Sequence, residues 1–303
     1  MSSNSFSLAS RVKLPSGHPM PQIQLGLYMM SGREASRAVH QALAAGYRGF
    51  DSAQMYGNER EAGLAIKKFL SGPENAQKVS REDIFYTSKL ASNSTSYDGV
   101  RASIRESVKE CGLGYVDLFL LHSPYGGAEA RRTSWKALED AVLEGEVRSA
   151  GVSNYGVRHI EELMASSPRV PVSVNQVEVH PFNTREDIRA ACAKHGIVVE
   201  AYAPLARAMR MRNLTVVALS KQYGCTPAQL LVRWSLQHGL VPLPKSVRRE
   251  RLLENADVGS FEISDEDMAK LDALDEGLVT DCVGGNGSQV EANNIEERAS
   301  LLK

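Results

Sequence analysis

Short apolar segments alternate with longer amphipathic segments along most of this chain. Eight apolar segments have the length and residue types of buried strands, and they span 23–28, 48–51, 84–90, 116–122, 147–154, 172–178, 197–205 and 240–246. Nearly continuous apolar strands that alternate with helices are typical of a parallel sheet. Eight such units in 303 residues, with no second composition regime, predict the α/β class and a closed (β/α)8 TIM barrel.

Helix start signals support this division of the chain. Ser31 and Glu34 have the spacing of a capping box, in which each side chain binds the backbone N–H of the other residue. Thr226 and Gln229 repeat that spacing, and Pro227 suits the first helical position. These residues predict that helices begin at the amphipathic segments that follow them.

The two ends of the chain lie outside the repeating units. A short strand from Arg11, a turn at Ser16 and Gly17, and a returning strand predict an N-terminal hairpin. Residues 277–303 begin with a stretch rich in Gly, Asn and other polar residues, which predicts a long C-terminal loop. Residues 1–303 are therefore predicted to form one barrel domain with a hairpin and a C-terminal tail.

Charge and composition exclude several classes of function. A net charge of -1 gives no electrostatic basis for binding nucleic acid or an anionic membrane. No apolar run approaches the roughly 18–20 residues of a membrane span, and the polar N-terminus lacks the apolar region of a secretory signal. The cysteines have no metal-like spacing and indicate free thiols in a reducing cytoplasm; they are Cys111, Cys192, Cys225 and Cys282. We therefore expect a cytoplasmic protein without a metal site.

Polar side chains gather at the carboxyl ends of the predicted strands. In chain order they are Asp51, Lys89, His122, Ser153, Asn154, Gln176, Tyr202, Lys245 and Ser246. A closed barrel brings all of these ends to one mouth, whereas an open doubly wound sheet brings together only those near its switch point. No G-x-G-x-x-G follows the first strand, so the dinucleotide-binding open sheet is disfavoured.

Four segments carry a resemblance to a known family. FDSAQMYGNE at 50–59, LLHSPY at 120–125, GVSN at 151–154, and PKS followed by RLLEN between 244 and 255 closely resemble the signature segments of the aldo-keto reductases. The resemblance runs from about residue 12 to residue 274. It implies a catalytic tetrad consisting of Asp51, Tyr56, Lys89 and His122.

The same resemblance implies binding sites for NADPH (NADP+). Ser153, Asn154 and Gln176 would bind the nicotinamide carboxamide, and Tyr202 would stack on the ring. The remaining positions would contact the pyrophosphate, the 2′-phosphate and the adenine; they are Leu205, Lys245, Ser246, Val247, Arg251, Glu254 and Asn255. Basic residues at a helix start are repelled by the positive end of the helix dipole. Their presence there is explained if an anion binds at the helix start. The residues thus favour NADPH over NADH.

The implied reaction is reduction of an aldehyde or ketone to an alcohol by hydride transfer. Tyr56 would act as the general acid, although a free phenol has a pKa near 10. Lys89 beside it should lower that pKa by stabilising the phenolate, and Asp51 would hold Lys89 in place. His122 would orient and polarise the carbonyl.

The substrate region departs from the family pattern. Ser123 stands where many members carry an aromatic residue, and Ala91 stands where some carry Trp. We expect a wide pocket whose apolar wall is formed by Tyr28 and Met55, with the C-terminal tail folding over the substrate. The small-molecule carbonyl is the expected partner, and the chain is expected to be a monomer or a weak dimer.

Two alternatives from other classes remain open. A class I aldolase could form a Schiff base at Lys89 or Lys245, and borohydride trapping would detect it. A regulatory barrel could bind NADPH with little turnover. NADPH binding measured together with NADPH consumption on a panel of aldehydes separates this reading from a reductase.

Overall fold

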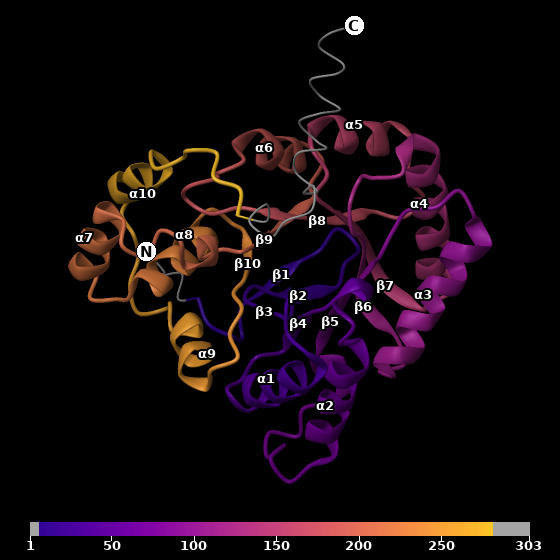
Figure 1. The fold of residues 1–303 in the computed structure, drawn as a ribbon, viewed down its shortest axis with the longest axis horizontal. Coiled ribbons are helices and arrows are strands. Elements are labelled where there is room, and N and C mark those ends of the chain that lie inside the picture. The colour runs from indigo at the N-terminus through magenta and orange to yellow at the C-terminus, as the bar shows by residue number, and fades with distance from the viewer. Residues whose placement is uncertain (1–5, 281–303) are drawn as a thin grey trace, which may run out of the picture.

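The computed structural model describes residues 6–280, and within them parallel strands form a barrel surrounded by helices (Figure 1). The sheet order is β10-β9-β8-β7-β6-β5-β4-β3, so each strand lies beside its neighbour in the chain. The strands are β3 (Leu25–Gly26), β4 (Gly49–Asp51), β5 (Phe85–Leu90), β6 (Val116–Leu121), β7 (Val147–Ser153), β8 (Val172–Glu178), β9 (Val198–Tyr202) and β10 (Val241–Leu243). All eight correspond to predicted segments.

The barrel closes where its first and last strands meet. The N–H of Gln24 donates to the carbonyl of Pro242, and the N–H of Gly26 donates to the carbonyl of Pro244, each at 3.3 Å. These hydrogen bonds join β3 to β10 and leave neither strand as an open edge. The predicted (β/α)8 barrel is therefore confirmed.

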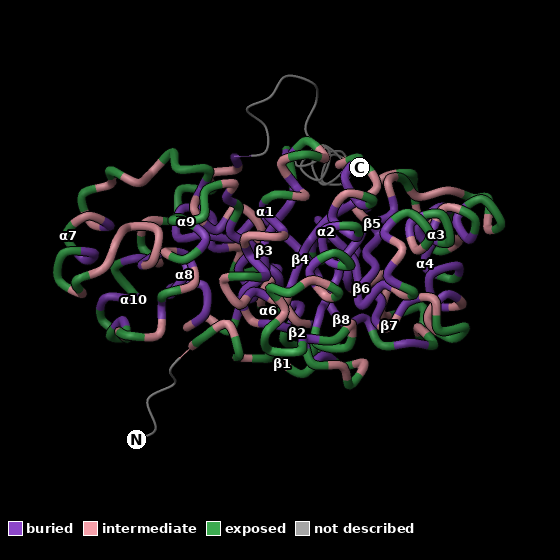
Figure 2. The backbone as a smooth tube through the Cα atoms, turned by 90° about the horizontal axis from the view of Figure 1, so that it is seen from below, coloured by how far each residue is buried: buried purple, intermediate pink, exposed green. Residues whose placement is uncertain are grey.

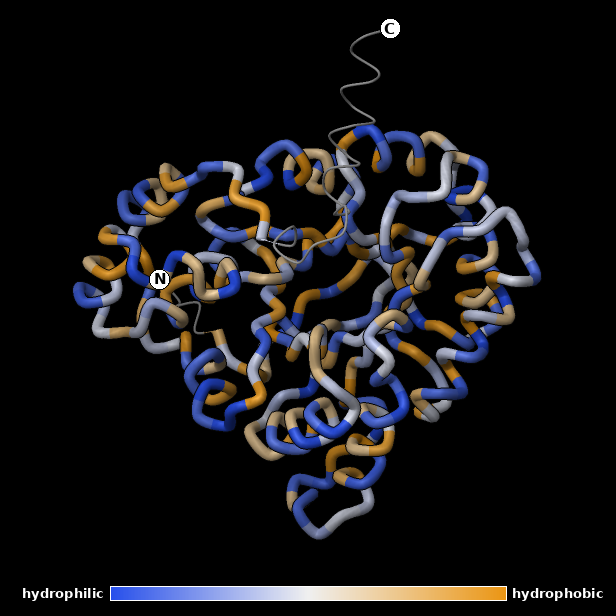
Figure 3. Tube along the Cα trace, viewed as in Figure 1, coloured by the Kyte–Doolittle hydropathy of each residue, from blue (hydrophilic) through white to orange (hydrophobic). Residues whose placement is uncertain are grey.

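The helices form the outer layer. They are α1 (Gly32–Ala44), α2 (Glu59–Ser71), α3 (Tyr97–Cys111), α4 (Gly127–Leu143), α5 (Val157–Ala165), α6 (Glu186–Lys194), α7 (Leu214–Gln222), α8 (Pro227–Gln237), α9 (Arg249–Ala256) and α10 (Asp265–Asp272). Hydrophobic residues are frequent on the strands, and along the outer helices hydrophobic and hydrophilic residues alternate (Figure 3). Both predicted capping boxes are present, one at the start of α1 and one at the start of α8.

The predicted hairpin is also present and covers the end of the barrel opposite the strands' carboxyl ends (Figure 2). It consists of β1 (Arg11–Lys13) and β2 (Pro19–Pro21). Its residues Leu14 and Met20 are buried in one apolar cluster with Phe85 and Val241, which begin β5 and β10. The hairpin thus closes the barrel floor and leaves the carboxyl ends of the strands as the accessible mouth.

The start of the predicted tail is held beside β8. The backbone N–H of Leu278 donates to the carbonyl of Phe182 at 2.8 Å, and the N–H of Thr280 donates to the Glu178 carboxylate at 2.9 Å. Cys282 and the rest of the tail, 281–303, lie outside the described residues, so the single-domain boundary and the tail's role stay predictions. No helix of residues 6–280 combines the length and the apolar character needed to cross a membrane.

Candidate active site

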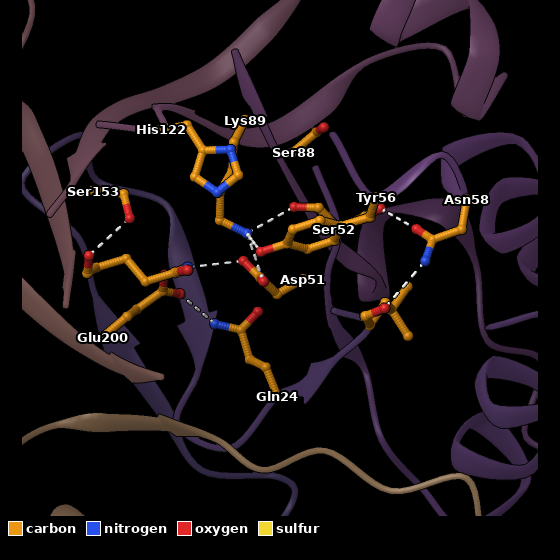
Figure 4. Close-up of polar contacts among 12 residues, drawn as sticks. Gln24, Asp51, Ser52, Tyr56, Asn58, Ser88, Lys89, His122, Ser153 and Glu200 are labelled. Carbon is orange, nitrogen blue, oxygen red and sulfur yellow. Dashed lines mark hydrogen bonds and ion pairs between the residues drawn. The ribbon is translucent and has the colours of Figure 1, made fainter. Parts of the chain in front are cut away.

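A buried lysine lies at the centre of the barrel mouth (Figure 4). Lys89, on β5, is 0% exposed, and its Nζ contacts Asp51 Oδ1 at 2.6 Å and the carbonyl of Ser52 at 2.8 Å. The same Nζ lies 3.2 Å from the hydroxyl of Tyr56. A buried ammonium is tolerated because its donors have partners. The predicted Asp51, Lys89 and Tyr56 therefore meet as a single hydrogen-bonded group.

The short 3-10 helix η1 (Gln54–Tyr56) delivers the Tyr56 hydroxyl to Lys89. Gly57 ends this turn with φ 62°, a left-handed conformation that glycine adopts without strain. The Gln54 side chain accepts from the N–H of Ala91 at 2.8 Å and donates to the carbonyl of Ser103 at 3.0 Å. These contacts tie η1 to the end of β5 and to α3, so the phenol is held by rigid elements.

Asn58 fixes the other side of the same loop. Its Oδ1 accepts from the Ser52 hydroxyl at 2.7 Å, and its Nδ2 donates to the carbonyls of Leu27 and Met30 at 3.1 and 3.0 Å. Asn58 is fully buried, so these bonds satisfy groups that would otherwise be costly to bury. Asn58 thereby joins the loop that follows β4 to the loop that follows β3.

His122 completes the predicted tetrad. Its ring centroid lies 5.8 Å from that of Tyr56, at an interplanar angle of 73°. Burial, assisted by the positive charge of Lys89, lowers the pKa of His122 to about 3. The imidazole is therefore neutral near pH 7. A neutral imidazole can donate a hydrogen bond to a carbonyl oxygen without bringing a second positive charge next to Lys89.

The predicted carboxamide-binding residues form a connected network on β7, β8 and β9. Asn154 adopts φ 61°, and its Nδ2 donates to the carbonyl of His122 at 3.0 Å. The Tyr202 hydroxyl donates to Asn154 Oδ1 at 3.0 Å, and the Ser153 hydroxyl donates to the carbonyl of Gln176 at 2.8 Å. The four side chains are thus brought together next to the candidate tetrad.

Two further residues of this network, Glu200 and Gln24, were missed by the sequence reasoning. Gln176 Nε2 donates to both Asp51 Oδ2 and Glu200 Oε2 at 2.8 Å, and Gln24 Nε2 donates to Glu200 Oε1 at 2.8 Å. A Cβ at Gly49 would lie 2.4 Å from Cγ of Gln24, so glycine leaves the room for this side chain. The available signal was an acidic residue inside the apolar segment 197–205.

The predicted phosphate-binding segment lies at the start of α9. Arg251 is exposed in the first turn, and the side chain of the N-cap residue, Arg248, makes no capping hydrogen bond. The Ser246 hydroxyl accepts from the N–H of Arg248 at 3.0 Å, and Lys245 Nζ reaches the carbonyl of Met29 at 3.2 Å. The N–H groups of the first turn and these cations can together bind an anion.

The other predicted contacts are spread around the same mouth. Tyr28 is 43% exposed and Met55 is 60% exposed. The ring centroids of Tyr28 and Tyr56 are 5.1 Å apart. Ser123 is only 6% exposed, which gives it little surface to offer a substrate. The other predicted cofactor-binding residues differ in burial. Leu205, Val247 and Glu254 are partly buried, and Asn255 is buried.

Comparisons with known proteins assign the chain to a family. The model of the Aldo/keto reductase family matches residues 22–276. An uncharacterized oxidoreductase of Schizosaccharomyces pombe is 47% identical over 274 residues, which cover 90% of this chain and 97% of the relative. The glyoxal reductase of Bacillus subtilis is 39% identical, with 88% and 94% covered. The crystal structure of a Bombyx mori aldo-keto reductase in complex with NADP has a TM-score of 0.84 and 31% identity, and 91% of this chain and 95% of that one are covered.

This protein belongs to the aldo/keto reductase family. The predicted family, the barrel fold and the assignment as an oxidoreductase are therefore confirmed. The predicted cofactor, NADP(H), agrees with family membership and with the NADP bound in the Bombyx mori structure. The roles of the individual residues stay predictions.

Proposed function

We propose that this protein reduces aldehydes or ketones to alcohols with NADPH, and that Tyr56 is the general acid. The observation that carries the proposal is the position of Lys89 Nζ, which lies between the Asp51 carboxylate and the Tyr56 hydroxyl at 2.6 and 3.2 Å. An ammonium next to a phenol stabilises the phenolate that remains after proton transfer. This is the arrangement that a phenolic acid requires to release its proton near neutral pH.

Each residue of the tetrad has a distinct part in the proposed mechanism. The Tyr56 hydroxyl gives its proton to the carbonyl oxygen as that oxygen gains negative charge. Lys89 then balances the phenolate, and Asp51 holds Lys89 in reach. The neutral imidazole of His122 donates a hydrogen bond to the same oxygen and orients it. NADPH, when bound, supplies the hydride to the carbonyl carbon.

The residues at the mouth fit this cofactor. Gln176 has both of its amide N–H groups directed to the carboxylates of Asp51 and Glu200. Only the NH2 end of an amide can face two carboxylates, so its Oε1 is left as an acceptor suited to the NH2 of a carboxamide. At the other end, Lys245 and Arg251 would bind the 2′-phosphate together with the start of α9.

Replacing Arg251 with alanine is expected to weaken NADPH binding by about 10–100-fold, because a hydrogen bond to a charged group contributes about 1.5–3 kcal/mol. NADH binding should change by less than about 3-fold, since NADH has no 2′-phosphate. Both dissociation constants can be measured from the quenching of tryptophan fluorescence.

Arg249→Ala is the matched control for that measurement. Arg249 lies in the same turn of α9 and is also exposed, so its loss removes an equal charge at a different position. A smaller loss of NADPH affinity in Arg249→Ala than in Arg251→Ala is expected. Equal loss of NADPH and NADH affinity in Arg251→Ala would contradict the 2′-phosphate contact.

The reductase itself is tested by combining an NADPH titration with NADPH consumption on a panel of carbonyls. The panel should include small dicarbonyls, because a relative is a glyoxal reductase, and larger aromatic aldehydes and ketones, because Tyr28 and Met55 are exposed at the mouth. We expect both binding and turnover. Tight NADPH binding without consumption on any member would instead favour a regulatory barrel, and trapping of a carbonyl by borohydride would favour an aldolase.

The proposal also covers the cellular compartment and the oligomeric state of the enzyme. The scattered cysteines are consistent with a reducing cytoplasm, and Cys111 and Cys192 are buried free thiols. All candidate site residues named above come from this one chain. We therefore propose a cytoplasmic enzyme that acts as a monomer or a weak dimer.

A further inference from the structure

The barrel holds a second buried carboxylate beneath the candidate tetrad (Figure 4). Glu200, on β9, is 0% exposed, and one nitrogen of Gln176 links it to Asp51 through two hydrogen bonds of 2.8 Å. The nearest oxygens of the two carboxylates are therefore separated by no more than twice that length. In the registered sheet, Glu200 lies directly beside Gln176, so its position is fixed by strand pairing as well as by side chains.

The charges around Glu200 do not balance when it is ionised. The charged groups that act on it are Asp51 from β4 and Lys89 from β5, while Gln24 and Gln176 are neutral. Asp51 and Lys89 already neutralise each other at 2.6 Å. Asp51, Lys89 and an ionised Glu200 together therefore carry a net negative charge. That charge opposes any further negative charge nearby, including a phenolate at Tyr56.

We propose that Glu200 is a positioning residue that acts through Gln176 and the Asp51–Lys89 pair to keep Tyr56 in its phenol form, and thereby favours carbonyl reduction over alcohol oxidation. The inference rests on the proposed role of Tyr56. In reduction, the carbonyl carbon gains a hydride, its oxygen gains the phenol proton, and a phenolate remains. In oxidation, the phenolate takes the hydroxyl proton while the hydride leaves to NADP+. Glu200 thus favours the form of Tyr56 with which reduction begins.

The ionisation of Glu200 leaves a signature in stability. Burial, together with the charge of Asp51, raises the pKa of Glu200 to about 7. A carboxyl whose pKa is raised by folding contributes stability that is fully present below its unfolded value and is lost as pH rises through about 7. Glu200→Gln should therefore gain stability relative to wild type at pH 8 and gain less at pH 5. Urea unfolding at the two pH values measures this difference without cofactor or substrate.

The decisive experiment is a titration of Tyr56 in the free protein. The ultraviolet absorbance of phenolate is followed with pH in the wild type and in Tyr56→Phe, and the difference reports Tyr56 alone. The same pair is then measured with Glu200→Gln in both proteins. We expect the midpoint pH of the Tyr56 titration to fall by about 0.5–1 pH unit when Glu200→Gln removes the buried negative charge. The alkaline limb of carbonyl reduction should fall with it, and alcohol oxidation should extend to lower pH.

Glu139→Gln is the matched control. Glu139 is a buried glutamate on α4 that pairs with Arg169, so the same chemical change is made away from the barrel interior. It should leave the Tyr56 midpoint where it is in the wild type. Gln24→Met is the second variant if Glu200→Gln fails to fold. It removes a hydrogen bond that favours the ionised Glu200, and it should lower the midpoint by a smaller amount.

The outcomes separate this inference from the proposed function. A midpoint that stays fixed or rises in folded Glu200→Gln, while the wild type turns over and shows the Tyr56 titration, overturns the role of Glu200 alone. A shift as large in Glu139→Gln also overturns it. A wild type that binds NADPH but reduces no carbonyl overturns the proposed function instead.

Discussion

The Tyr56→Phe variant is expected to bind NADPH as the wild type does and to lose about 10²–10⁴-fold in turnover number, the usual contribution of a general acid. The change removes one oxygen and keeps the ring, which packs near His122 and Tyr28. The loss should therefore arise from the missing proton donor and not from a distorted mouth. Single-turnover consumption of NADPH measures it, because this method isolates the chemical step from product release.

Tyr28→Phe provides the matched comparison for Tyr56→Phe. Tyr28 lies on the same side of the mouth, with its ring 5.1 Å from that of Tyr56, and its ring is likewise kept. The chemical step of Tyr28→Phe should slow by less than about 10-fold. In the described structure Lys89 forms its tyrosine hydrogen bond with Tyr56 and none with Tyr28. Similar single-turnover rates in the wild type and in Tyr56→Phe would remove Tyr56 from the mechanism.

Lys89→Met is expected to have the largest effect on the fold. Asp51 would lose its 2.6 Å partner while it remains buried near a second carboxylate, Glu200. Breaking a buried ion pair by removing one partner costs about 3–5 kcal/mol, because the other charge is left without compensation. The free energy of unfolding in urea should fall by that amount, and carbonyl reduction should be lost.

The double variant Asp51→Asn/Lys89→Met distinguishes an uncompensated charge from a general packing defect. With both charges absent, most of the stability lost in Lys89→Met should return, while catalysis should not. If the double variant is less stable than Lys89→Met, the packing of the lysine stem, and not its charge, explains the loss.

Features set by local chemistry could be predicted from the sequence. The capping boxes at Ser31 and Thr226 depend on residues three positions apart, and both are present. Asp51, Lys89 and His122 were expected to meet because they stand at the carboxyl ends of parallel strands, which a barrel brings to one mouth. Tyr56 follows in the loop after β4, and the contacts of Lys89 with Asp51 and Tyr56 agree with that expectation.

The contacts beneath the tetrad could not be predicted because they join distant parts of the chain. Gln24 and Glu200 are 176 positions apart, and their hydrogen bond depends on barrel closure and on the space left by Gly49. The hydrogen bonds that anchor η1 through Gln54 and its loop through Asn58 also join separate segments, 49 and 31 positions apart. Polar residues in apolar segments signal that partners exist, but not which residues they are.

Under the proposed role of Glu200, the hydrogen bond between Gln24 and Glu200 links the completion of folding to the onset of activity. Gln24 precedes the first strand of the barrel and Glu200 lies on the seventh, and the last strand, β10, lies between them in the closed sheet. Contacts between such remote segments form only after the entropy of closing a long loop has been overcome. A partly folded chain can therefore hold most of its helices and strands and still lack this charge network. Enzymatic activity regained on refolding would then report the joining of the first and last strands of the barrel, β3 and β10.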